Sequence, residues 1–151
     1  MIEAVIVMLL VAVLSMGIGS FILTAMQAWV VVSQRGSQLN VGRVAMNRMT
    51  AEIRRVRALA FLTTYTVTRC AFTDMNNNPI DYQQSGTSLM RNSDVLAGGL
   101  ASPGGLRFDY LNALGGTASG TPEMRSIRVK ITLVSGTQRM TLESSARIRN
   151  L

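Results

Sequence analysis

Residues 2–14 have the sequence IEAVIVMLLVAVL, and after Glu3 no ionisable side chain follows before Arg35. A helix rises about 1.5 Å per residue, so about 20 apolar residues cross a hydrocarbon layer about 30 Å thick. The apolar run continues to Val32 and exceeds that length. Buried core helices usually keep a polar stripe, and the run is too long for the apolar part of a signal peptide. The sequence therefore predicts a membrane-spanning helix in residues 1–32.

Glu3 places a carboxyl group at the edge of this apolar run. Moving an ionised carboxylate into hydrocarbon costs about 3 kcal/mol or more, so we expect Glu3 to meet a partner. The pattern I-E-A-V-I-V-M-L-L-V resembles the N-terminus of mature type IV pilins and type II secretion pseudopilins. In that family a leader ending in Gly is removed, the new N-terminal residue is methylated, and a Glu stands four residues after it. Glu3 matches that Glu, and Ile2 matches the aliphatic residue before it.

Two features depart from the family pattern. Only Met1 and Ile2 precede Glu3, where the family has four residues, so we expect the true start of the mature chain and its leader to lie further upstream. The proline that commonly kinks the family's helix is absent. Gly17 and Gly19 lie near that place and can loosen the helix without removing a hydrogen-bond donor.

Residues 33–60 continue the helical period with a different composition. Apolar and small residues recur at spacings of three and four, which predicts a single helix from residue 2 to about residue 60. The residues on this apolar face are Leu39, Gly42, Met46, Met49, Ile53, Val56 and Ala60. Gly36 and Gly42 each cost up to about 1 kcal/mol in a helix interior. With the two earlier glycines they predict places of helix flexibility.

The other side of the same stretch is basic, in a chain with a net charge of +7. Its residues are Arg43, Arg48, Arg54, Arg55 and Arg57. A basic helix face is usually solvated, and we expect Glu52 to pair with Arg48 or Arg55. The sharper alternative is a nucleic-acid surface, but phosphate contacts without stacked aromatic side chains give only unspecific, salt-sensitive binding. The pattern therefore argues against nucleic acid as a partner.

Histidine is absent, and cysteine occurs once, at Cys70. A Cys/His zinc site and a histidine-based catalytic triad within this chain are therefore excluded. The acidic residues of the second half are scattered rather than grouped, so we expect no enzyme activity, no catalytic or metal site and no cofactor. A lone cysteine forms no intrachain disulfide, and free cysteine is among the most buried residue types, so we expect Cys70 to be buried.

Residues 61–151 predict a β-rich domain. Residues 61–72 (FLTTYTVTRCAF) are rich in β-branched and aromatic side chains and predict a strand or a pair of strands. Residues 74–86 (DMNNNPIDYQQSG) predict a polar, turn-rich segment. Residues 85–105 hold two short apolar patches followed by a loop.

The end of the chain has a clearer strand pattern. Residues 106–111 (LRFDYL) alternate and predict a strand, and residues 115–122 predict a flexible connection. Residues 126–134 and 138–148 predict a hairpin with a Ser-Gly-Thr turn. Its first strand places four apolar residues on one face, namely Ile127, Val129, Ile131 and Leu133.

Asp74, Asn76 and Asn78 form the first half of a D-x-N-x-N calcium loop. Pro79 stands where that loop needs Gly, and Ser85 stands where it needs a bidentate Glu. Asn and Asp also cluster in turns for their own hydrogen-bonding reasons. The sequence therefore favours a turn in residues 74–81 over a calcium site.

The C-terminal strands extend the resemblance to minor pilins of the W type and minor pseudopilins of the J type. The residues that match are the aromatics Phe108 and Tyr110, the strand residues Arg128, Val129, Ile131 and Leu133, and the terminal Arg147, Arg149 and Asn150. This resemblance implies that Glu3 pairs with a free N-terminal amine, on its own or a neighbouring subunit. Pairing would neutralise two charges that are costly when buried singly.

The sequence and the resemblance together predict an α+β fold. A long N-terminal helix, with a membrane-spanning first half and an amphipathic second half, packs on a C-terminal antiparallel sheet. The expected parts are residues 1–32, 33–60 and 61–151. The resemblance implies a structural minor subunit of a type IV pilus or a type II secretion pseudopilus, and a DNA-binding minor pilin of a DNA-uptake pilus is the alternative. Secretion, motility and uptake all stay open.

The same resemblance implies partners and a location. Other pilin or pseudopilin subunits would bind through their N-terminal helices, and a prepilin peptidase would process the chain. Before assembly the chain would cross the inner membrane once, with its C-terminal domain in the periplasm, and it would then enter the pilus or pseudopilus.

Overall fold

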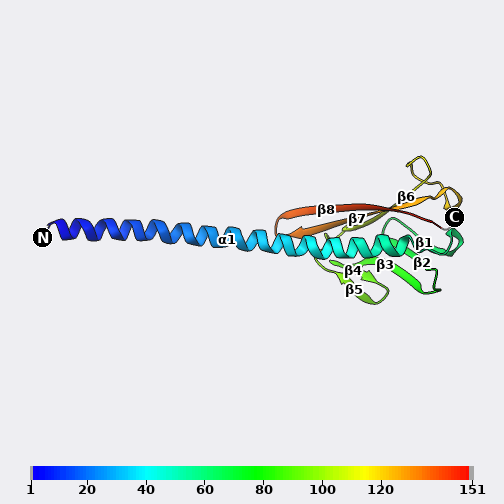
Figure 1. Ribbon diagram of the computed structural model, residues 1–151, viewed down its shortest axis with the longest axis horizontal. Helices are drawn as coiled ribbons and strands as arrows, with labels where there is room; N and C mark the ends of the chain where they lie inside the picture. The colour runs from blue at the N-terminus through cyan, green and yellow to red at the C-terminus, as the bar shows by residue number, and fades with distance from the viewer. Residues whose placement is uncertain (1, 150–151) are drawn as a thin grey trace. The chain divides into compact units, whose positions relative to one another are not determined.

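The computed structural model describes residues 2–149, apart from the side chain of Gln34 (Figure 1). Met1 and Asn150, which entered the resemblance, lie outside the described residues. Helix α1 (Ile2–Ile53) is followed by strands and by two short 3-10 turns, Leu59–Phe61 and Thr121–Glu123. The chain divides into two compact units, Met1–Ser37 and Gln38–Leu151, and each is described by itself.

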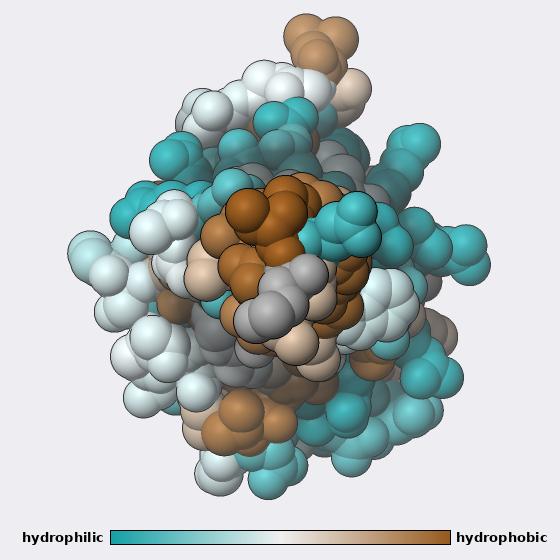
Figure 2. Space-filling model, turned by 90° about the vertical axis from the view of Figure 1, so that its left-hand side faces the viewer, coloured by the Kyte–Doolittle hydropathy of each residue, from teal (hydrophilic) through white to brown (hydrophobic). Residues whose placement is uncertain are grey.

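The first unit is the N-terminal part of α1. Every side chain described between Ile2 and Ser33 is exposed, and the helix is long and apolar enough to cross a membrane. Figure 2, which looks onto the N-terminal end, shows brown hydrophobic side chains on several sides of this helix. The few hydroxyls donate hydrogen bonds to carbonyls of the preceding turn, as Ser15 does to Val11 O at 2.7 Å and Thr24 to Ser20 O at 2.9 Å. Internal bonds of this kind make a polar side chain tolerable in hydrocarbon.

The second unit contains two antiparallel sheets. The strands of the first sheet pair in chain order, and they are β1 (Leu62–Tyr65), β2 (Arg69–Thr73), β3 (Pro79–Ser85), β4 (Ser88–Arg91) and β5 (Asp94–Ala97). The strands of the second sheet are β6 (Leu106–Leu111), β7 (Ser126–Ser135) and β8 (Gln138–Arg147), also in chain order.

The segment between β5 and β6 ties the two sheets together. β7 extends beyond its pairing with β6, and there it forms main-chain hydrogen bonds with this segment. Thr132 O accepts from Ala101 N at 2.8 Å, and Thr132 N donates to Gly105 O at 2.7 Å. The loop expected at the end of residues 85–105 is therefore bound to the second sheet through main-chain hydrogen bonds of Gly99, Ala101 and Gly105.

The core forms around the last turns of α1, which pack against both sheets. Met49 and Ile53 have no exposed surface, and they share one apolar cluster with Phe72 and Tyr82 of the first sheet and Phe108 of the second. Burying a large apolar side chain contributes about 1.5–3 kcal/mol, so this cluster dominates the stability of the unit.

Several predictions from the sequence are confirmed. The α+β architecture is the expected one, with the second part of the helix packed on antiparallel sheets. Residues 61–72 supply a strand pair, and β6 has the predicted bounds. The hairpin of β7 and β8 is also confirmed, and the four apolar residues on the inner face of β7 are fully buried.

The predicted end of the helix near Ala60 is wrong, because α1 ends at Ile53. Backbone pairing with the chain after β2 competes with the helix from that point on. Met75 N donates to Arg55 O at 3.0 Å, Arg57 N donates to Thr73 O at 3.2 Å, and Val56 forms a bridge with Asp74. Tertiary pairing of this kind overrides a continuing helical pattern in the sequence.

The prediction that residues 79–85 belong to a polar turn is also wrong, because they form the central strand β3. Ile80 and Tyr82 are buried in the core, and the alternate residues Asp81 and Gln83 are partly exposed. Pro79 is compatible with this strand because a proline is tolerated at a strand's first residue. β4 and β5 likewise lie where the sequence indicated only apolar patches and a loop.

Gly42 lies where α1 crosses the hairpin of β7 and β8. A Cβ atom there would stand 2.5 Å from Leu133 Cδ1 and 2.9 Å from Leu142 Cδ1. We expect Gly42→Leu to lower the free energy of unfolding by about 1–2 kcal/mol, because overpacking outweighs the gain in helix propensity. Denaturant titration of Gly42→Leu tests this expectation, with Val44→Leu as the control because Val44 is exposed on the same helix. Equal stability of the two variants would contradict the expected overpacking.

The fragment 38–151 should fold alone, because every buried core residue lies in the second unit. We expect a monodisperse, β-rich protein by size exclusion and circular dichroism. An aggregated or unfolded product would mean that the apolar part of α1 contributes to the core.

Candidate functional site

The first candidate site is Glu3 with the apolar segment that follows it. Glu3 lies in the first turn of α1, where a carboxylate is favoured by the positive end of the helix dipole. It is exposed, as are the described side chains that follow it as far as Ser33. Within the first unit, no described residue covers this apolar surface.

The five arginines of the expected basic helix face do not all lie on the helix. Because α1 ends at Ile53, only Arg43 and Arg48 are helical. Arg54 and Arg55 lie in the turn that follows, and Arg57 lies beyond it. All five are exposed, as expected for a solvated surface, but the structure distributes them over different surroundings.

Two of these arginines share a groove with a residue from the end of the sequence. A groove of about 480 Å³ is lined by Ala51, Arg54, Arg55, Met75 and Arg149. Sequence reasoning did not connect Arg149 with the helix arginines, because 94 positions separate it from Arg55. The hairpin β7–β8 brings the two together by returning the chain to this end of the domain.

Arg57 is held apart from this groove by contacts of its own. Its guanidinium lies 4.7 Å from the centre of the Phe61 ring and donates a hydrogen bond to Asn77 Oδ1. Stacking on an aromatic face is a favourable position for a guanidinium. One face of the Phe61 ring is therefore already covered by Arg57.

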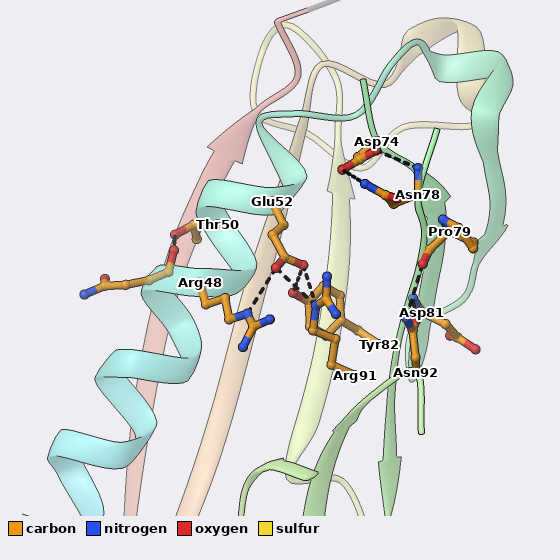
Figure 3. A network of polar contacts seen from close by, with 11 residues as sticks. Arg48, Thr50, Glu52, Asp74, Asn78, Pro79, Asp81, Tyr82, Arg91 and Asn92 are labelled. Atoms are coloured by element: carbon orange, nitrogen blue, oxygen red, sulfur yellow. Dashed lines mark hydrogen bonds and ion pairs between the residues drawn. The ribbon is translucent and has the colours of Figure 1, made fainter. Parts of the chain in front are cut away.

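A polar network joins α1 to the first sheet around Glu52 (Figure 3). Its carboxylate accepts hydrogen bonds from Arg48 on the same helix at 3.1 Å, from Arg91 of β4 at 2.9 Å and from the Tyr82 hydroxyl of β3 at 2.5 Å. The expected pairing of Glu52 with Arg48 is confirmed, and the pairing with Arg55 is not found. Arg91 and Tyr82 were not expected from the sequence.

The environment of Glu52 favours its charged form. Burial alone would raise the pKa of the Glu52 carboxyl, but hydrogen bonds from Arg91, Tyr82 and Arg48 outweigh burial and hold the pKa below its ordinary value. Burial and the bond to Glu52 raise the pKa of Tyr82. The group is thus a charged clamp between helix and sheet, with every acceptor position of the carboxylate in use.

The stretch that resembles half a calcium loop is a hydrogen-bonded turn. Asp74 Oδ1 accepts from Asn76 N and Asn78 N, both at 2.8 Å, and Asp74 Oδ2 accepts from the Asn78 side chain at 3.3 Å. These bonds, led by the one from the Asn78 main chain, lower the pKa of the Asp74 carboxyl. Within residues 2–149, no three Asp, Glu, His or Cys side chains are grouped closely enough to hold a metal ion.

Cys70 is buried in β2, as expected. Burial raises the pKa of its thiol to about 12, so the thiol is protonated at neutral pH. A protonated, buried thiol is a poor nucleophile and a poor metal ligand. Cys70 is therefore a packing residue of the core.

The other acidic side chains of the domain are mostly bound in surface ion pairs. Asp81 pairs with Arg69, Asp109 with Arg107, and Glu143 with both Arg128 and Lys130. The described residues thus offer two separate candidate sites. One is the apolar helical surface with the Glu3 carboxylate in the first unit, and the other is the groove with three guanidinium groups in the second unit. No protein-family model, curated protein or solved structure matches this chain.

Proposed function

We propose that this chain is a structural minor subunit of a type IV pilus or a type II secretion pseudopilus. It would cross the inner membrane once before assembly and place its C-terminal domain in the periplasm. The observation that carries the proposal is the surface of the N-terminal unit: its apolar side chains are exposed from Ile2 to Val32, and Glu3 is the sole ionisable group among them. A surface of this kind needs an apolar environment along its whole length.

Assembly through such a helix requires little free energy. When the helix leaves lipid and packs among other apolar helices, one apolar environment replaces another, so little net hydrophobic energy is required. Specificity then depends on polar groups, and Glu3 is the one charged group that the segment offers. A carboxylate that pairs with an ammonium group in the filament would fix the axial position of the subunit.

Site-specific photo-cross-linking tests the proposal. A photoreactive amino acid replaces Leu14, whose side chain is exposed in the middle of the apolar segment. In cells that assemble filaments, we expect cross-links to the N-terminal helices of other filament subunits. In cells that lack the major subunit, the same probe should react with lipid alone. Lipid adducts without subunit cross-links in filament-bearing cells would contradict the proposal.

A further inference from the structure

We propose that the groove lined by Arg54, Arg55 and Arg149 binds an acidic segment of a partner protein. We call it the arginine groove; Ala51 and Met75 complete its lining. The inference concerns the second unit alone and does not rest on the assembly of the N-terminal helix.

None of the three guanidinium groups forms an ion pair with a described residue of the domain. Within residues 2–149, Arg54, Arg55 and Arg149 take part in no ion pair and no side-chain hydrogen bond. Six other basic residues of the domain are paired, namely Arg48, Arg69, Arg91, Arg107, Arg128 and Lys130. The arginine groove is therefore a concentration of positive charge that forms no ion pair with residues 2–149.

The carboxylates of Asp74 and Glu52, which are close in sequence to Met75 and Arg54 of the lining, bind other groups. Asp74 attracts Arg55 electrostatically, but its oxygens accept hydrogen bonds from Asn76 and Asn78. Glu52 belongs to the network with Arg91. Among residues 2–149, no carboxylate forms an ion pair in the arginine groove that a carboxylate from another molecule would have to displace.

Neutralising the end of the helix does not explain these arginines. Cations near a helix C-terminus often bind its last carbonyl groups. Here main-chain amides take those carbonyls: Arg54 N donates to Thr50 O, Arg55 N to Glu52 O and Val56 N to Ile53 O. The three guanidinium groups stay available for a ligand.

The backbone beneath the arginine groove is fixed before any ligand binds. Arg55 O accepts a hydrogen bond from Met75 N at 3.0 Å, and Val56 is fully buried. On the other side, Arg149 follows Ile148, which is buried and donates its N–H to Arg125 O at 3.0 Å. A fixed backbone reduces the entropy lost on binding.

The chemistry of the lining favours a protein partner over nucleic acid. Guanidinium groups bind carboxylates with two parallel hydrogen bonds, and the exposed Met75 side chain offers an apolar contact beside them. Nucleic-acid binding would use a longer basic track with free aromatic rings for stacking, whereas the Phe61 ring already carries Arg57. We therefore expect the ligand to alternate Glu or Asp with aliphatic residues.

A binding titration tests the proposal with the full chain in uncharged detergent micelles. The probes are a labelled ten-residue peptide of alternating Glu and Leu, and single-stranded oligothymidylate of equal net charge. We expect the peptide to bind at about 150 mM salt. The double variant Arg54→Glu with Arg149→Glu should lower the affinity for the peptide by tenfold or more. Met75→Gln should weaken binding of the peptide and leave binding of the oligonucleotide unchanged.

The matched control is the double variant Arg43→Glu with Arg139→Glu. It reverses the charge of two exposed arginines that form no ion pair with residues 2–149. It should change peptide binding less than about twofold if the arginine groove is specific. Thermal unfolding of each variant verifies that the fold is retained. Absence of peptide binding, or equal losses in both double variants, would overturn the proposal. Tighter binding of the oligonucleotide that is lost in the groove variant would replace it with a nucleic-acid site.

Discussion

Glu3→Gln should reduce incorporation of the chain into filaments by about 100-fold or more, while insertion into the membrane stays unchanged. If Glu3 neutralises an ammonium group within a filament, glutamine leaves that charge buried and unpaired, at a cost of about 3–5 kcal/mol. If the carboxylate only complements the start of α1, the loss is about 0.3–1 kcal/mol, which changes incorporation less than about tenfold. The two mechanisms therefore differ by an amount that a quantitative assay resolves.

The measurement is the ratio of filament-bound to membrane-bound protein at equal expression. Gln27→Ala is the matched control, because it alters a polar but uncharged residue of the same apolar segment. We expect this control to behave as the unaltered protein does. Normal incorporation of Glu3→Gln would refute charge pairing while leaving the proposed subunit role to the cross-linking experiment.

The parts of the fold that the sequence predicts well are those in which one local period governs burial. β7 alternates strictly, and its inner residues are all buried by the two sheets and α1. The apolar face of the helix shows the same agreement as far as Ile53. In both segments the periodicity of the sequence and the geometry of the core demand the same residues.

The sequence prediction failed where pairing with distant residues decides the structure. β3 contains only two large apolar residues, Ile80 and Tyr82, and polar side chains surround them in sequence. Its strand conformation comes from hydrogen-bonded neighbours on both sides, β2 and β4. The end of α1 is set in the same way, by main-chain bonds from residues 73–75.

The two candidate sites differ in the same way: one is visible in the local sequence, and the other depends on residues that are distant in sequence. Glu3 is conspicuous in sequence because an isolated charge interrupts an apolar run. The arginine groove is not, because Arg149 reaches Arg54 and Arg55 only through the return of the β7–β8 hairpin. The sequence shows the arginines of residues 43–57 as one basic face, but nothing local to them indicates that Arg149 joins two of them.

Glu52→Ala should lower the free energy of unfolding of the fragment 38–151 by about 2–4 kcal/mol. The substitution leaves the Arg91 guanidinium and the Tyr82 hydroxyl without their partner in a site where the Glu52 side chain is only 15% exposed. Breaking a largely buried, hydrogen-bonded pair on one side costs several kcal/mol, and the partial exposure here reduces that cost. Urea denaturation at pH 7 measures the loss.

Glu143→Ala is the matched control for this experiment. Glu143 also contacts two basic side chains, Arg128 and Lys130, but its side chain is 45% exposed. Exposed ion pairs contribute about 0–1 kcal/mol, so the control should lose no more than that. Equal losses in the two variants would show that the network around Glu52 is a surface ion pair and not a clamp.

The pH dependence gives an independent measure of the same network. The pKa of Glu52 is lower in the folded domain than its ordinary value of 4.5, so the unfolded chain binds the proton more tightly. The stabilisation is therefore fully present above about pH 4.5 and is lost as the pH falls through the folded pKa. The difference in stability between the unaltered domain and Glu52→Gln, which removes the titrating group, should be constant above about pH 5 and shrink below about pH 4.5. A difference that stays constant into acid would mean that the charge on Glu52 contributes nothing to the hold between helix and sheet.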